Sequence, residues 1–152
     1  MITGLKALKR NQYGKDFICN TMQLVHDELK PDNFYIAYFN KTGTQATSLA
    51  YYINGNKKVS NISYMLDDIP CRKVLESGAI YLLSSQAHLI YPKDKLLVEY
   101  GFEAYLGIPI FSQHDDVIGI LVCLFDQPIT LVPAQFDWCE GIGHQLGSEL
   151  QY

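Results

Sequence analysis

The chain of 152 residues is 48% hydrophobic and 18% charged, which suits one globular domain with its own core and argues against two domains. Twelve lysines and arginines against sixteen aspartates and glutamates leave a formal net charge of −4, so the basic excess of a nucleic-acid-binding protein is missing. No apolar run approaches the roughly 20 residues of a membrane-spanning helix, and the N-terminal region lacks the apolar stretch of a secretion signal.

The cysteines Cys19, Cys71, Cys123 and Cys139 are widely spaced and include no Cys-x-x-Cys pair. Three of them fall in expected regular elements among apolar neighbours, which favours reduced, buried thiols over a disulfide framework. With no secretion signal and no disulfide pattern, we expect a cytoplasmic protein that contacts neither nucleic acid nor membrane. A single domain should span residues 1–152, with its core at about 13–150.

The first expected element is a helix that begins at Tyr13. Ile18, Met22, Val25 and Leu29 form an apolar stripe at helical spacing, and the stripe ends at Leu29. Short polar turns then separate runs that are rich in apolar and aromatic residues. The strands expected from these runs lie at residues 34–39, 45–53 and, more weakly, 57–60.

The middle of the chain is less regular. Pro70 can open a short helix that runs to Leu75 and is closed by Gly78, because proline suits a first helical turn and glycine suits the residue after a helix. We expect a short strand at 80–83 and another brief helix at 92–98.

Residues 104–125 contain two strand-like runs joined by a short polar turn. Each run is apolar at odd and even positions alike, which predicts a hairpin in the middle of a sheet that is covered on both faces. Pro109 cannot donate to a strand ladder, so we expect a bulge or an unpaired position there. Gly107 and Gly119 leave space for other groups to approach the sheet closely.

A last helix is expected at 133–150. Gly143 and Gly147 would form a smooth groove on it, and each glycine costs roughly 1 kcal/mol against alanine inside a helix, so the pair needs a reason. Packing against the first helix explains the groove about as well as association with a second copy of the chain. The order of the elements indicates an α+β domain with a largely antiparallel sheet.

A family resemblance rests on residues 70–78, Tyr81, residues 91–94, and residues 104–109 with Gly119. These stretches resemble GAF domains of bacterial sensory proteins. The resemblance implies a six-stranded antiparallel sheet related to that of PAS domains, with the N- and C-terminal helices on one face and short helices and loops over a pocket on the other. It further implies a small-molecule ligand and an output module, either attached to the domain or supplied by a partner, that receives a signal through the terminal helices.

No motif of a catalytic site is present, and we expect no enzymatic activity. Glu140 and His144 could share a helix face, but two side chains do not make a metal site. Cys71 is the strongest candidate for reactivity, because a helix start beside Arg72 and Lys73 could favour a thiolate. The alternative, which we favour, is a small semi-buried residue under the pocket. The closely set cysteines of methionine sulfoxide reductases in the wider family are absent.

The cofactor is unknown. Bilin-binding members attach their chromophore to a cysteine that is commonly followed by histidine, and no cysteine of this chain is followed by one. Residues 40–43 do not reproduce the motif of cyclic-nucleotide-binding members. Haem would need an axial ligand, for which only His88 is well placed, and a solvent-exposed loop histidine is the simpler interpretation.

The eleven tyrosines are more suggestive, since tyrosine can enclose a small, partly polar ligand. We expect a non-enzymatic sensory domain of a signal-transduction protein that binds an unidentified small molecule and forms a homodimer through its terminal helices. The alternatives are a dimerisation module with a collapsed pocket and a thiol-based redox sensor or reductase that uses Cys71. The expected ligand-binding residues are Tyr52, Tyr64, Cys71, Val74, Tyr81, His88, Phe102 and Tyr105.

Overall fold

The computed structural model describes residues 13–53, 56–59 and 62–150. Its helices are α2 (Tyr13–Leu29), α3 (Pro70–Ser77), α4 (Ala87–Ile90), α5 (Lys95–Tyr100) and α6 (Pro133–Leu150). Its strands are β1 (Asn33–Phe39), β2 (Gln45–Ile53), β3 (Asn56–Val59), β4 (Ser63–Met65), β5 (Tyr81–Leu83), β6 (Ala104–Phe111) and β7 (Val117–Phe125). Cys19 and residues 57–59 belong to these elements, but their side chains lie outside the described ones.

Six of the strands pair antiparallel in the order β3-β2-β1-β7-β6-β5. This confirms the six-stranded antiparallel sheet that the family resemblance implied, although no strand order was predicted. A seventh strand, β4, was not predicted. It pairs with β2 beside this path through only three residue pairs, among them Ala46 with Tyr64. A three-residue strand is too short to show a periodicity in the sequence.

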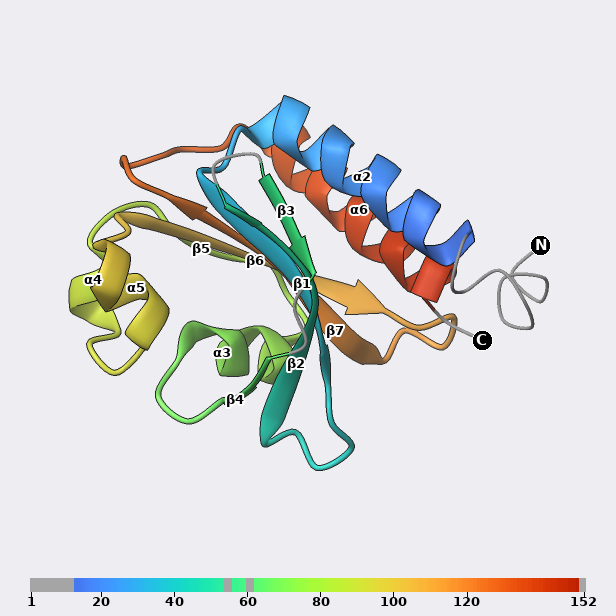
Figure 1. Ribbon diagram of the computed structural model, residues 1–152, viewed down its shortest axis with the longest axis horizontal. Helices are drawn as coiled ribbons and strands as arrows, with labels where there is room; N and C mark the ends of the chain where they lie inside the picture. The colour runs from blue at the N-terminus through green and yellow to red at the C-terminus, as the bar shows by residue number, and fades with distance from the viewer. Residues whose placement is uncertain (1–12, 54–55, 60–61, 151–152) are drawn as a thin grey trace.

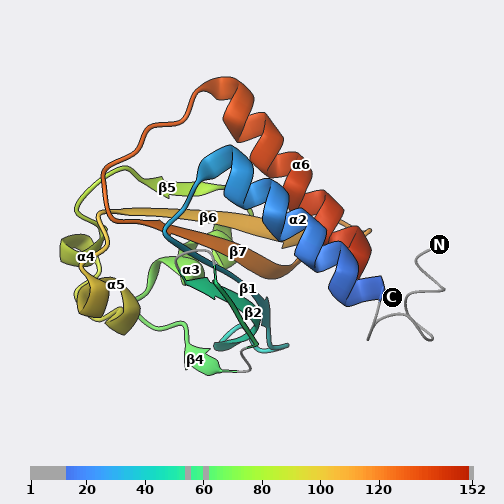
Figure 2. The ribbon, with the colours of Figure 1, turned by 45° about the horizontal axis from the view of Figure 1, so that its top comes forward.

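The sheet separates two layers. Helices α2 and α6 lie side by side on one face, and α3, α4 and α5 lie with their connecting loops on the other (Figures 1 and 2). Each layer has its own core: Met22 and Leu146 belong to the helical one, and Cys71 and Leu97 belong to the other. The expected arrangement of an α+β domain with terminal helices on one face is therefore confirmed.

The predicted hairpin is the pair β6 and β7, and it is covered on both faces. Leu106 and Ile108 of β6 are fully buried on the side of the terminal helices, whereas Tyr105 is buried on the opposite side. The bulge, however, does not lie at Pro109, which stays in register with Ile120. The register shifts instead between Ile110 and Phe111.

The prediction for residues 92–98 was only partly right. One short helix was expected, but the chain forms α4 before it and begins α5 at Lys95. The side chain of Asp94 accepts hydrogen bonds from the backbone amides of Leu96 and Leu97, at 3.1 and 3.2 Å. This N-cap sets the helix start at Lys95, three residues after Pro92.

The two glycines of α6 pack against neither partner that the sequence suggested. A Cβ atom on Gly143 would overlap the carbonyl oxygen of Pro109, and one on Gly147 would overlap that of Phe111. The glycine groove therefore seats α6 on the backbone of β6, within the same domain. By contrast, a Cβ on Gly141 would meet nothing within 4 Å.

No helix within the described residues is both long enough and apolar enough to cross a membrane.

Gly147→Ala should lower the free energy of unfolding by about 2 kcal/mol, because the added methyl group must displace the backbone of β6. The matched change Gly141→Ala, on the open side of the same helix, should be neutral or stabilising by up to about 1 kcal/mol. Chemical denaturation of both variants measures the difference. If Gly147→Ala kept full stability and instead changed the mass of the protein in solution, the groove would serve a second copy of the chain.

Candidate functional site

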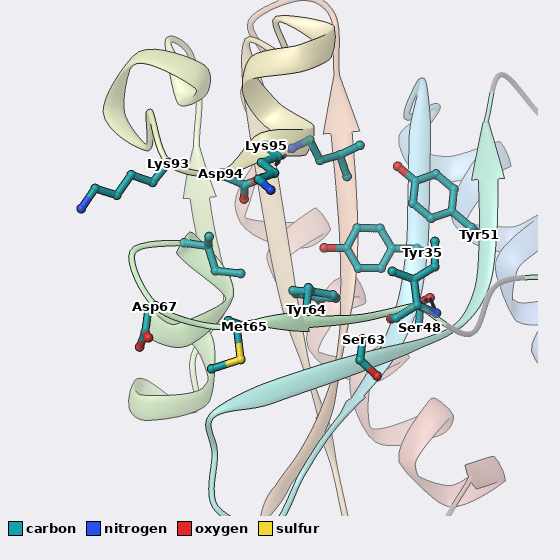
Figure 3. Close-up of a pocket in the computed structure, with 13 residues that line it drawn as sticks. Tyr35, Ser48, Tyr51, Ser63, Tyr64, Met65, Asp67, Lys93, Asp94 and Lys95 are labelled. Carbon is teal, nitrogen blue, oxygen red and sulfur yellow. Dashed lines mark hydrogen bonds between the residues drawn. The ribbon is translucent and has the colours of Figure 1, made fainter.

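An open cavity of about 680 Å³ lies on the face of the sheet opposite to α2 and α6 (Figure 3). One wall is formed by β1 and β2, and the other by the chain around β4 and by the start of α5. The lining residues are Tyr35, Ser48, Tyr51, Ile62, Ser63, Tyr64, Met65, Asp67, Ile69, Lys93, Asp94, Lys95 and Leu96.

Three tyrosine rings form the aromatic part of the lining. Tyr35 and Tyr51 are direct cross-strand partners on β1 and β2, and their rings stack with centroids 5.2 Å apart and planes 9° apart. The ring of Tyr64 meets that of Tyr35 edge-on, at 6.1 Å and 86°. The pairing of two central strands thus fixes two of the rings, and β4 brings the third.

Cys71 lies beneath this cluster in the first turn of α3. The Tyr105 hydroxyl donates a hydrogen bond to Cys71 Sγ at 3.3 Å, and the hydroxyls of Tyr35 and Tyr64 each lie 3.8 Å from the same sulfur. Gly107 permits this close packing, because a Cβ there would lie 2.7 Å from both Tyr105 Oη and Val74 Cγ2. The predicted close approach at Gly107 is therefore confirmed.

The thiol of Cys71 is protonated at neutral pH. Burial raises its pKa to about 11, although the three tyrosine hydroxyls act in the opposite direction. The cation next to it is also engaged elsewhere, since the Arg72 guanidinium lies 3.2 Å from Glu76 and 3.8 Å from Asp67. The idea that the helix start favours a thiolate at Cys71 is thus wrong, because desolvation outweighs the dipole of one short helix.

Asp94 contributes a carboxylate to the cavity. Its Oδ1 caps α5, and no hydrogen bond from a described residue is found for its Oδ2. Figure 3 shows the carboxylate pointing into the space that the tyrosines border. Burial raises its pKa, while the two backbone amides lower it.

A second polar atom lacks a partner. Among the described residues, no hydrogen bond reaches the buried hydroxyl of Tyr51. Burial raises the pKa of this group to about 12, and the nearby Asn33 side chain lowers it only in part. This hydroxyl is closed off from the cavity and has Asn33 as its polar neighbour, so the group that offers a hydrogen bond to a guest molecule is the Asp94 carboxylate.

The structure brings some of the predicted ligand-binding residues together. Tyr64 lines the cavity, and Cys71 and Tyr105 lie directly beneath it through the contacts described above. Val74 is fully buried one helical turn further on, against Gly107. These positions form one cluster around the cavity floor.

The other predicted residues lie elsewhere. Tyr52 points to the face of the terminal helices, where it stacks on Phe34 at 4.7 Å. Tyr81 contacts the hydroxyl of Tyr91 at 3.1 Å, and Phe102 packs on Tyr100. None of the three is in the cavity lining.

His88 is also outside the cavity lining. Its Nδ1 lies 3.0 Å from the carbonyl oxygen of Phe102 and 3.7 Å from a carboxylate oxygen of Glu103, so it joins α4 to the start of β6. It is therefore neither a cavity ligand nor a freely exposed loop residue. Within the described residues no group of three potential metal-ligating side chains exists, and His144 stacks on Phe111 rather than pairing with Glu140.

Sequence reasoning missed Tyr35 and Asp94 and chose Tyr52 instead of Tyr51. A signal for Tyr35 existed, because alternation along β1 places it opposite to Phe34. The alternation could not tell which face holds the cavity, and two adjacent tyrosines on β2 left both faces aromatic. The position of Asp94 before a helical run indicates an N-cap, and that role alone gives no sign that the carboxylate also faces the cavity.

A family model described as GAF domain matches residues 15–150. No curated protein matches the chain. Solved structures do: the GAF domain of a two-component sensor histidine kinase from Bacillus halodurans superposes with a TM-score of 0.73 at 14% identity, over 90% of this chain and 92% of that one.

Two further solved GAF-domain structures, from different kinds of protein, also resemble the chain. The GAF domain of an Acinetobacter phosphoenolpyruvate-protein phosphotransferase gives a TM-score of 0.64 at 18% identity, over 91% of this chain and 92% of that one. The phycoerythrobilin-bound GAF domain of a cyanobacterial phytochrome gives 0.71 at 20% identity, over 98% and 90%. At these identities the likeness concerns the fold.

Cys71 should resist alkylation in the folded protein. With a pKa of about 11, roughly one thiol in ten thousand is ionised at pH 7, and the side chain is 1% exposed. Iodoacetamide labelling followed by peptide mass spectrometry should show Cys71 reacting at least about a hundredfold more slowly than in the same chain unfolded in guanidinium. Equal rates would restore the thiol-based redox sensor as a candidate.

Proposed function

The chain belongs to the GAF-domain family, and from this premise we propose that it is a non-enzymatic sensory domain of a signal-transduction protein, with a small molecule bound in the cavity between β1–β2 and residues 62–96. It is cytoplasmic, and it passes its state to an output module that is either attached or recruited. The observation that carries the proposal is the cavity itself, open and lined by three tyrosines.

The dimensions and chemistry of the cavity favour a ligand. Small-molecule sites commonly measure about 300–1,000 Å³ and combine apolar walls with a few polar groups that orient the guest. Here the apolar surface comes from aromatic rings and aliphatic side chains, and the Asp94 carboxylate, of which only Oδ1 caps α5, is the polar group that can orient a guest. An open cavity also speaks against the alternative of a dimerisation module whose pocket has collapsed.

The chemistry of the lining supports binding over catalysis. Among the described residues the lining includes no histidine and no cysteine, and the thiol beneath it is protonated. General acid–base and nucleophilic catalysis need a titratable group within hydrogen-bond reach of the reacting atoms, with a pKa near the working pH. The partly buried carboxylate of the lining, Asp94, has its Oδ1 engaged in the cap of α5, which suits it to hold a molecule in place.

The terminal helices can respond to the cavity through β1 and β2. Tyr35 faces the cavity, while its neighbour Phe34 faces the helices and stacks on Tyr52. The ring of Phe34 also lies 6.1 Å from that of His26 on α2. A ligand that moves the Tyr35–Tyr51 pair therefore also moves the side chains that pack against α2.

A polar contact joins the two terminal helices to each other. The Thr21 hydroxyl of α2 donates to the Glu149 carboxylate of α6 at 3.0 Å, and Gln145 donates to Thr21 at 3.2 Å. Thr21 and Glu149 are buried between the helices, so a shift of α2 changes the contacts of α6. Homodimerisation through the same helices remains part of the proposal, although it no longer draws support from Gly143 and Gly147.

Leu96→Trp should abolish ligand binding, because the larger side chain fills the cavity from the start of α5. The matched control is Val98→Trp, on the same helix at a site that is 47% exposed and outside the lining. Both variants and the parent are screened against cellular metabolites by native mass spectrometry and thermal shift. If no metabolite binds the parent protein, or if Leu96→Trp retains every ligand, the proposal fails.

The proposed coupling from the cavity through β1 and β2 to α2 has a separate test. Hydrogen exchange with a ligand from the screen should slow in β1 and β2 and also change in α2. Tyr52→Leu removes the ring that stacks on Phe34, so it should leave binding intact but abolish the change in α2. An unaltered response of α2 in Tyr52→Leu would show that the signal takes another route.

A further inference from the structure

On the premise that the cavity binds a small molecule, we propose that its ligand is an organic cation, a small molecule whose ammonium group lies between the tyrosine rings and the Asp94 carboxylate. This inference names the class of ligand for the site already proposed. It rests on the geometry of the aromatic rings and on the charges around them.

Three tyrosine rings in mutual contact form the aromatic side of the cavity. Tyr35 and Tyr51 are nearly parallel, and Tyr64 stands at 86° to Tyr35, so the cavity is bordered by ring surfaces in two orientations. The face of an aromatic ring is the negative part of its quadrupole and attracts a cation within about 6 Å of the centroid. Several rings around one space are the arrangement by which proteins hold methylated ammonium groups.

The second component of the proposed cation site is the Asp94 carboxylate. Asp94 uses Oδ1 for the cap of α5, and its side chain points toward the tyrosines, as Figure 3 shows. Its negative charge contributes to the raised pKa values of Tyr51, Tyr64 and Tyr105, so its field extends across the cavity and its floor. The same field stabilises a cation and repels an anion that occupies this space.

The remaining charged groups of the lining are at least partly compensated or exposed. Asp67 lies 3.8 Å from Arg72, and Lys93 lies 3.3 Å from Asp68, with both of these lining side chains about three-quarters exposed. Lys95 is exposed as well. Asp94, by contrast, is only partly accessible, so solvent and salt screen its charge less than the charges of the exposed lysines.

The test uses two probes of the same shape. Choline carries a quaternary ammonium group, and 3,3-dimethylbutan-1-ol replaces that nitrogen with carbon and is neutral. Calorimetric or NMR titration of the whole chain should show choline binding at least about tenfold more tightly, since a desolvated cation–π contact and one opposite charge together are worth at least that factor.

Two variants assign the effect to the groups named. Asp94→Asn removes the charge but keeps an oxygen that can cap α5, because asparagine is as good an N-cap as aspartate. This variant should bind choline about tenfold more weakly and bind the neutral probe with unchanged affinity. Tyr51→Leu should weaken choline as well, whereas Tyr51→Phe, which keeps the ring, should not. Thermal melting of each variant without probe checks that the fold is retained.

The outcomes separate this inference from the proposed function. Equal affinity for choline and its neutral analogue would contradict the proposal that the ligand is a cation, but not the proposal that the domain binds a small molecule. The same holds if the metabolite screen yields only anionic or neutral ligands, or if Asp94→Asn binds choline as well as the parent. If neither probe nor any metabolite binds, both proposals fall.

Discussion

A single constraint shapes this domain: the hairpin of β6 and β7 is apolar on both faces and must be covered on both. Two long helices with apolar stripes can cover one face, and their contact is dense enough that two glycines of α6 lie against the backbone of β6. The other face is covered by α3, α4, α5 and the chain between them. Short helices and loops do not fill a layer as completely as long helices do, and the cavity is the space that they leave.

The floor of that cavity is polar, but its groups are uncharged and unreactive at neutral pH. Cys71 is surrounded by three tyrosine hydroxyls, and each of these hydroxyls has a raised pKa, chiefly because of burial. All four groups are neutral at physiological pH, so the floor supplies hydrogen bonds without charge. The partly buried charge of the lining comes from one side, at Asp94. An asymmetric site of this kind orients a guest molecule, and the guest's own charge decides how strongly it is held.

The long elements could be predicted because their side chains repeat. The stripe on residues 13–29 and the two-sided apolar runs of β6 and β7 are periodic, and the expected helix and hairpin are where the structure has them. The cavity lining has no such regularity. Its members come from four separate stretches of the chain. The choice between Tyr51 and Tyr52 depends on which face of β2 the short helices cover, and only the tertiary structure decides that. Asp94 escaped for a related reason, because local rules describe it as a helix cap and only the tertiary structure places it at the cavity.

The seating of α6 on β6 limits how the domain can move. The two glycines lie one helical turn apart, and each receives a carbonyl oxygen of the strand. A screw motion that advanced the helix by one residue would bring the Cβ atoms of His144 and Ser148 against those oxygens. Rotation of α6 on the sheet is thereby opposed, whereas the hydrogen bonds at Thr21 that join α2 to α6 can be exchanged. We therefore expect a displacement that starts at the sheet to move the N-terminal helix more than the C-terminal one.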